Sequence, residues 1–236
     1  MARYTLDQLA RMVDHTNVHP NATHEDMIKL CDEAKQYHFK MVAVTALQSE
    51  ICSGQLAGTD IDTGAAIAFP FGQATIATKV FETKDALANG ANEIDYSINL
   101  TEVKAHNWDY VKDEMTQIVD VCNEAGVISK VILETYFLTD EEIIEICNIA
   151  SEVKPTFIKT SSGTVAGGAT TDDVALMRNT VDPAVKVKAS GGIRTADDFV
   201  AMVTAGAERI GCSQGIPIIE ELRRRMAEAG TDYIEI

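Results

Sequence analysis

The chain has 236 residues, enough for one large α/β domain with a sizeable hydrophobic core. Its formal net charge of −16 at pH 7 disfavours binding to nucleic acid or to an anionic membrane, so any phosphate must be held by a local site. No apolar run approaches the roughly 20 residues of a membrane-spanning helix, and the first residues lack the apolar core of a signal peptide.

Short β-like runs alternate with longer amphipathic stretches along the whole chain. We predict strands at 11–15, 40–45, 64–69, 93–98, 129–135, 156–160, 185–189 and 209–213. We predict helices at 24–37, 75–89, 108–125, 140–153, 171–179, 195–205 and 216–229. Helix starts are indicated by threonine before acidic first turns in "TDDV" (171–174) and "TADD" (195–198), and by Asp140 with its adjacent glutamates.

Eight strand–helix units without a linker or low-complexity break favour a closed (β/α)₈ barrel, an architecture of typically about 250 residues. We therefore predict a single TIM-barrel domain over residues 1–236, in which 230–236 form a tail that folds over the site or hangs free. A doubly wound open sheet is the rival architecture. No G-x-G-x-x-G motif follows the first strand, which weakens its dinucleotide-binding form.

Charged residues recur at alternate positions of several predicted strands, where every second side chain of a barrel strand points inward. Glu93 shares a face with Asp95, Lys130 shares a face with Ile132 and Glu134, and Lys186 shares a face with Lys188. If Lys159 points inward as well, the barrel interior is charged. Ion pairs or solvated strand ends would explain any one of these residues, but not the whole set as readily.

Asp95, Lys159 and Lys188 lie near the carboxyl ends of their strands, the face on which barrel enzymes build active sites. A second cation and desolvation both disfavour the protonated form of a lysine. A lysine with a pKa of about 7–8 becomes a nucleophile or base, and Schiff-base formation is its characteristic reaction. We therefore expect Lys159 to form an imine, with Lys188 as the perturbing cation and Asp95 as the group that passes protons through a water.

Glycine-rich loops follow the last three predicted strands: "SGTVAGGAT" (162–170), "SGG" (190–192) and "GCSQG" (211–215). Backbone N–H groups after strands 7 and 8 of a barrel commonly bind phosphate. A single glycine loop is weak evidence for such a site, because it more often marks a tight turn. Together the loops indicate a phosphate site.

Eight motifs now resemble one known family, that of 2-deoxyribose-5-phosphate aldolase. They occur in order from about residue 10 to residue 215: "DHT" (14–16), "FPFG" (69–72), "KVFET" (79–83), "EIDYSIN" (93–99), "KVILET" (130–135), "FIKTSSG" (157–163), "VKASGGIRT" (187–195) and "RIGCS" (209–213).

The resemblance implies a (β/α)₈ class I aldolase that reversibly cleaves 2-deoxyribose 5-phosphate to acetaldehyde and glyceraldehyde 3-phosphate, in deoxyribonucleotide catabolism. By position it makes Lys159 the Schiff-base lysine, Lys188 the lysine that lowers its pKa, and Asp95 the proton-relay acid. It also implies substrate or phosphate contacts at Thr160, Gly163, Gly191, Gly192 and Ser213.

Two departures from the family pattern concern the phosphate end. Relatives commonly carry lysine in "LKP" where this chain has His19 in "NVHP", and a second serine where it has Gln214. Asp95, Lys159 and Lys188 are all present, and we expect the phosphorylated sugar to remain preferred over the plain sugar. Because of the substitution at Gln214, we expect the margin of this preference to be narrower than in relatives with the second serine.

Three other functions fit parts of the sequence. A metal-dependent aldolase could use His15, His19 and His24, although these residues run from strand through loop to helix instead of converging. A phosphate-binding isomerase would need a carboxylate or histidine base and no paired lysines. A barrel kept for binding or regulation would be expected to lack Asp95, Lys159 or Lys188.

The remaining expectations concern cofactors, partners and location. We expect no cofactor and no metal, and small phosphorylated sugars and aldehydes as the only ligands. A homodimer is expected from the frequency of two-fold pairs among soluble enzymes. Five scattered cysteines, odd in number, are typical of a reducing cytosol and predict a cytoplasmic protein.

Overall fold

The computed structural model describes residues 2–236. Eight parallel strands form a closed barrel in chain order: β2 (Val13–Thr16), β3 (Met41–Thr45), β4 (Asp62–Ile67), β5 (Glu93–Ser97), β6 (Ile128–Ile132), β7 (Phe157–Lys159), β8 (Lys186–Ser190) and β9 (Arg209–Cys212). Because β2 pairs with both β3 and β9, the sheet has no edge. The predicted barrel is confirmed, and the open doubly wound sheet is wrong.

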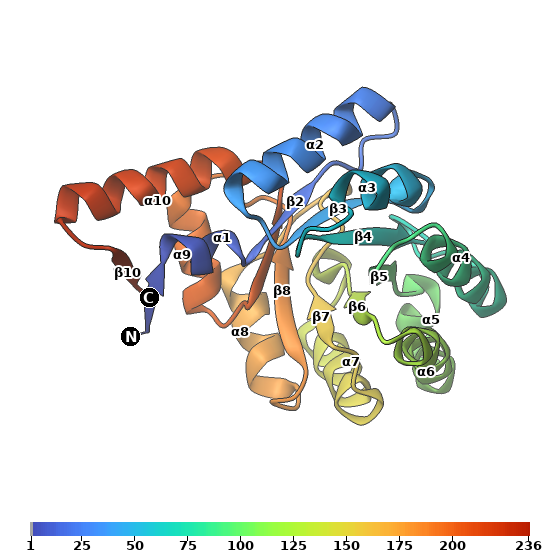
Figure 1. Ribbon diagram of the computed structural model, residues 1–236. Coiled ribbons are helices and arrows are strands. Elements are labelled where there is room, and N and C mark those ends of the chain that lie inside the picture. Colours follow the sequence, from blue (N-terminus) through green and yellow to red (C-terminus); the bar gives the residue numbers. More distant parts are fainter. Residues whose placement is uncertain (1) are drawn as a thin grey trace.

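One main helix follows each barrel strand and packs outside it (Figure 1). These helices are α2 (His24–Tyr37), α3 (Ser49–Leu56), α4 (Ile76–Ala88), α6 (Trp108–Ala125), α7 (Asp140–Val153), α8 (Thr171–Thr180), α9 (Ala196–Thr204) and α10 (Gly215–Ala229). All seven predicted helices are confirmed. The sequence prediction missed α3, because its eight residues include Gly54 and two serines and carry little apolar periodicity.

Short elements complete the chain. They are β1 (Arg3–Thr5), α1 (Leu6–Ala10), the 3₁₀ turns η1 (Ala46–Gln48) and η2 (Thr135–Phe137), α5 (Leu100–Lys104) and β10 (Tyr233–Glu235). None of them was predicted, since segments of three to five residues carry too few positions to show a period.

Threonine caps fix the starts of several outer helices. Thr195 accepts a hydrogen bond from the backbone N–H of Asp198, as expected from "TADD". In the helix after β7, however, the cap is Thr170 and not Thr171, because the Thr170 hydroxyl accepts from Asp173 N at 3.0 Å. The acidic first turn that "TDDV" predicted is present in either case, and it complements the helix dipole.

Alternation along the strands separates two kinds of side chain. Outward-facing residues such as Ile94, Ile158 and Val187 are fully buried in the hydrophobic core between sheet and helices. The residues between them point into the barrel, where the register sets Lys159 beside Lys188 on one side and Ile132 on the other. This alternation delivers polar side chains to the barrel axis. Lys186 begins its strand and reaches water, with Nζ 3.4 Å from Glu208.

The two ends of the chain meet in a separate two-stranded antiparallel sheet of β1 and β10 (Figure 1). Since α10 starts at the carboxyl end of β9 and runs back along the barrel, it delivers β10 to the amino ends of the strands. The guanidinium of Arg3 lies 4.5 Å from the ring centre of Tyr233. Tyr233 is therefore held at the end of the barrel opposite to the carboxyl end of β7.

Candidate active site

Seven charged side chains fill the middle of the barrel, and each is at most 5% exposed. They are four basic residues and three carboxylates: Lys130, Lys159, Lys188 and Arg209 with Asp14, Glu93 and Asp95. Burying single charges would cost several kcal/mol each, so their mutual pairing is what makes the cluster possible.

Asp95 is the centre of this cluster because it accepts hydrogen bonds from three lysines. Its Oδ2 accepts from Lys159 Nζ at 2.9 Å and from Lys188 Nζ at 2.6 Å. Its Oδ1 accepts from Lys130 Nζ at 2.6 Å. Burial alone would raise the pKa of Asp95, but the three ammonium groups hold it well below its usual range. Asp95 is therefore ionised at neutral pH.

The other two carboxylates lie deeper and are shared between cations. Asp14 Oδ2 pairs with Lys188 Nζ at 2.5 Å, and Asp14 Oδ1 accepts from Arg209 Nε at 2.7 Å. Glu93 pairs with Lys130 and, at 3.1 Å, with Arg209. Consequently, Lys188, Lys130 and Arg209 each contact two carboxylates, whereas Lys159 contacts only Asp95.

Lys159 is the cation of the cluster that loses its proton most readily. Burial is the main cause that lowers its pKa, to about 8; Asp95 opposes this shift, while the like charges of Lys188 and Lys130 add to it. With Lys159 neutral, three cations face three carboxylates, so the cluster is balanced. About a tenth of Lys159 is then the free amine at pH 7.

The amine of Lys159 faces a narrow cavity at the carboxyl end of the barrel. Its wall includes Thr16, Ala43, Asp95 and Ser162. Thr16 and Ser162 also line a larger cavity of about 270 Å³, so the two spaces adjoin. A small molecule can therefore reach Lys159 with one end while its other end occupies the larger cavity.

The larger cavity is built from the loops after β7, β8 and β9. Gly163, Gly191, Gly192 and Ser213 all lie in its wall. Gly191 has φ +86°, and a Cβ there would lie 3.1 Å from the Cα atoms of Gly163 and Gly168, so the loops can approach only through glycine. The first turn of α10 starts beside Ser213 and directs free N–H groups toward the same end of the barrel, where an anion is stabilised.

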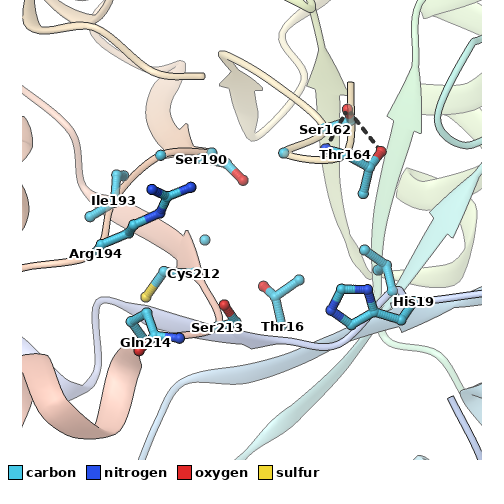
Figure 2. A pocket seen from close by; sticks show the side chains of 15 residues that line it. Thr16, His19, Ser162, Thr164, Ser190, Ile193, Arg194, Cys212, Ser213 and Gln214 are labelled. Carbon is cyan, nitrogen blue, oxygen red and sulfur yellow. Dashed lines mark hydrogen bonds between the residues drawn. The ribbon is translucent and has the colours of Figure 1, made fainter. Parts of the chain in front are cut away.

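Figure 2 shows the polar side chains of this cavity converging on its centre. The guanidinium of Arg194 and the imidazole of His19 approach from opposite sides, and the hydroxyls of Ser190, Thr16 and Ser213 lie between them. No carboxylate is among the described residues that line this cavity. This composition suits an anion such as a phosphate monoester.

Thr160 is the one predicted ligand contact that the structure does not place in a cavity wall. Its side chain is fully buried, and Oγ1 donates to Ser190 O at 3.2 Å and accepts from Ser190 N at 3.1 Å. The reason is strand alternation: Lys159 points inward, so Thr160 points outward and joins the ends of β7 and β8.

Several residues of the site were missed from sequence. Asp14 and Arg209 complete the charge cluster, and both lie on strands that were predicted. The same alternation could have identified Asp14, since it lies two residues before Thr16. Glu134 was assigned a strand face but no role; its Oε2 accepts from Ser162 N at 3.0 Å and so fixes the turn that carries Ser162.

The histidines considered as metal ligands do not converge. His15 Nε2 is hydrogen-bonded to Glu33 Oε2 at 2.8 Å, against Phe39, with ring centres 5.0 Å apart. Across residues 2–236, no three His, Cys, Asp or Glu side chains form a metal-binding group. In the same part of the chain, every helix is too short or too polar to cross a lipid bilayer.

Comparison with known proteins shows which family the chain belongs to. The profile of the DeoC/LacD family aldolases matches residues 8–218. A protein of Lactobacillus acidophilus named deoxyribose-phosphate aldolase is 59% identical over 99% of both chains, and one of Bacteroides thetaiotaomicron with the same name is 49% identical over 93% of this chain and 92% of its own. The tetrameric structure of deoxyribose phosphate aldolase from Aeropyrum pernix superposes with a TM-score of 0.86, at 30% identity, over 93% of this chain and 92% of its own.

The fold and the site define a (β/α)₈-barrel enzyme with a buried lysine beside a polar cavity suited to an anion. The matched region extends from α1 into α10 and so covers the whole barrel. The chain belongs to the DeoC/LacD family of aldolases and is itself an aldolase.

Proposed function

We propose that the enzyme reversibly cleaves 2-deoxy-D-ribose 5-phosphate to acetaldehyde and D-glyceraldehyde 3-phosphate through a Schiff base on Lys159. The observation that carries this proposal is the environment of Lys159. Its amine contacts one carboxylate, that of Asp95, and its pKa is lowered to about 8. It faces the narrow cavity, which adjoins the larger cavity, and no carboxylate is among the described residues that line the larger one. The names of the relatives support the choice of substrate. Residues 1–236 would act as one aldolase domain.

In the first step, the neutral amine of Lys159 attacks the aldehyde carbon of the open-chain sugar. The carbinolamine that results loses water and becomes a protonated imine, which withdraws electrons from C2. Low water content around Lys159, which is 5% exposed, favours the neutral amine before attack and the dehydrated imine after it.

In the second step, the C3 hydroxyl loses its proton and the C2–C3 bond breaks. The bonding electrons move into the imine and produce an enamine on Lys159, while C3 leaves as the aldehyde of glyceraldehyde 3-phosphate. Protonation of the enamine at C2 and hydrolysis then release acetaldehyde and the free lysine. Phosphate held by the glycine loops and Arg194 would anchor the departing half during bond cleavage.

In this scheme Asp95 is ionised at the start of the reaction and acts as a proton acceptor. Three lysines stabilise its ionised form, so it can accept a proton only transiently, through a water that bridges to substrate. The same water can return that proton from Asp95 to C2 of the enamine, while the hydrogen bond from Lys188 Nζ holds Oδ2 in position.

Asp95→Asn is expected to slow proton transfer more than imine formation. The amide cannot accept the proton, so exchange of the acetaldehyde methyl protons with D₂O, followed by NMR, should fall roughly 10²–10⁴-fold. Because Asp95 raises the pKa of Lys159, the substitution should lower that pKa. Borohydride should therefore still trap acetaldehyde on Lys159, and trapping should begin at the same pH or at a lower one. Exchange at the wild-type rate would contradict this role of Asp95.

The proposed function is tested by incubating the purified enzyme with 2-deoxy-D-ribose 5-phosphate and measuring acetaldehyde and glyceraldehyde 3-phosphate. Both should appear in equal amounts, and kcat/KM should exceed that for plain 2-deoxyribose. We expect a narrower margin than in relatives with a serine in place of Gln214, whose amide donates hydrogen bonds but is bulkier than a hydroxyl. No cleavage of either sugar would refute the proposal.

We further propose that the enzyme works in the cytoplasm, in the breakdown of deoxyribonucleotides. The acidic composition and five free, buried cysteines support a reducing compartment. We propose a homodimer, because two-fold symmetric dimers are the commonest oligomers of soluble proteins. The relative from Aeropyrum pernix is described as a tetramer. Light scattering of the purified protein distinguishes these states.

A further inference from the structure

His19 occupies a position between two cavities. It lies in the exposed loop between β2 and α2, and it lines both the 270 Å³ cavity and a second one of about 220 Å³. Thr16 and Ser213 are the other residues common to both walls. Its imidazole therefore has the phosphate pocket on one side and the first turns of α2 on the other.

The charged side chains around this imidazole differ on its two sides: one side has a single cation, and the other has two carboxylates and one cation. Arg194, from the loop after β8, faces it across the larger cavity (Figure 2). The second cavity is lined by Asp26, Lys29 and Glu33 of α2 and by His15 of β2. Glu33 is engaged by His15 at 2.8 Å and lies 3.7 Å from Lys29, and Asp26 caps α2 through Thr23 at 2.8 Å. These contacts hold the carboxylates of Asp26 and Glu33 on the α2 side of His19, outside the larger cavity.

Two side chains of different chemistry thus face an anion in the larger cavity. Arg194 offers a planar fork of N–H donors, and the backbone N–H groups of the glycine loops add further donors. His19 offers a ring N–H from the opposite side. Among the residues the structure describes, these are the two side chains of the cavity lining that carry ring or guanidinium N–H donors.

We propose that His19 is a specificity-determining residue whose ring N–H donates a hydrogen bond to the substrate phosphate and so favours the phosphorylated sugar. This inference rests on the proposed function. His19 would add a hydrogen bond to the anion from the side opposite to Arg194. Preference for the phosphorylated substrate should accordingly weaken when this donor is removed.

The test compares kcat/KM for 2-deoxyribose 5-phosphate with kcat/KM for 2-deoxyribose, as a ratio, at pH 7.5. Titration of Lys159 affects both substrates, so it cancels in the ratio. The ratio for His19→Ala should be about tenfold below that of wild type, from the loss of one hydrogen bond to a charged group.

Two further variants separate hydrogen bonding from shape. His19→Lys keeps N–H donors on a side chain of different shape, so its ratio should stay close to that of wild type. His24→Asn removes an exposed histidine at the start of α2 that lines neither cavity, and its ratio should follow wild type. Since His19 is an exposed loop residue, its variants are expected to fold, and circular dichroism checks this.

The possible results are distinguishable. An equal ratio for wild type and His19→Ala would show that His19 does not bind the phosphate. A ratio for His19→Lys as low as that of His19→Ala would mean that the shape of the imidazole acts and not its N–H donor, and either result overturns the inference while the proposed function stands. If the wild type cleaves neither sugar, the inference and the proposed function fail together.

Discussion

Lys159→Ala is expected to reduce cleavage of 2-deoxyribose 5-phosphate by at least roughly 10⁴-fold, because the variant lacks the amine on which the imine forms. Lys130 and Lys188 cannot replace it, since each is held by two carboxylates. A coupled assay for glyceraldehyde 3-phosphate measures the loss.

The fold should survive this substitution. Without Lys159, three cations face three carboxylates, and Asp95 keeps Lys130 at 2.6 Å and Lys188 at 2.6 Å. We expect the free energy of unfolding to change by less than about 2 kcal/mol. Lys84→Ala, on the exposed face of α4, serves as the matched control and should retain activity. Cleavage by Lys159→Ala within tenfold of wild type would exclude Lys159 as the nucleophile.

Lys188→Leu is expected to have the second largest effect on activity, through a change in the pH dependence of kcat/KM. In wild type, kcat/KM should rise with pH until Lys159, with a pKa of about 8, is deprotonated. Removal of Lys188 takes away a like charge and leaves Asp95 Oδ2 to Lys159 alone, and both changes raise the pKa of Lys159. The rising limb of the pH profile should therefore move to a more alkaline midpoint.

The size of this effect follows from the neutral fraction of Lys159. Each unit of upward shift in its pKa lowers the free amine at pH 7 about tenfold, so activity should fall roughly 10²-fold or more. The orphaned Oδ2 of Asp14 should also destabilise the fold by about 3–5 kcal/mol. Lys188→Arg keeps the charge, and its midpoint should stay near that of wild type. A Lys188→Leu profile with an unshifted midpoint would show that Lys188 acts by shape.

The barrel could be predicted because each level of the sequence indicates the same fold. Eight apolar runs alternate with amphipathic stretches, and the charged residues Asp95, Lys159 and Lys188 fall on the inward parity of their strands. The period of two along a strand fixes which face a side chain takes, so the direction of these three residues followed from their neighbours.

The pairing inside the barrel could not be predicted in the same way. Asp14 and Arg209 are 195 positions apart in the chain and meet only because β9 closes against β2. Strand alternation predicts the direction of a side chain but not its partner. The contacts of Lys188 with both Asp95 and Asp14 could therefore be recognised only from the register of the closed barrel. For the same reason, we predicted from the sequence that Lys188 is the main cause of the low pKa of Lys159, whereas in the structure burial is the larger cause.

Loops were predicted least well, because their positions depend on contacts between segments distant in the chain. Thr160 matched a family position but points away from the cavity, toward Ser190. Arg194 and His19 come from opposite sides of the larger cavity, in the loops after β8 and β2, and neither residue shows a periodicity that would have indicated their convergence.

The central claim is that Lys159 forms the imine, and trapping tests it most directly. Wild-type enzyme is incubated with acetaldehyde and sodium borohydride at pH 7.5, and intact mass and peptide mapping follow. We predict a single N-ethyl group, carried by Lys159 and absent from the enzyme treated with borohydride alone. An unmodified Lys159, or an ethyl group on Lys130 or Lys188 in its place, would contradict the assignment.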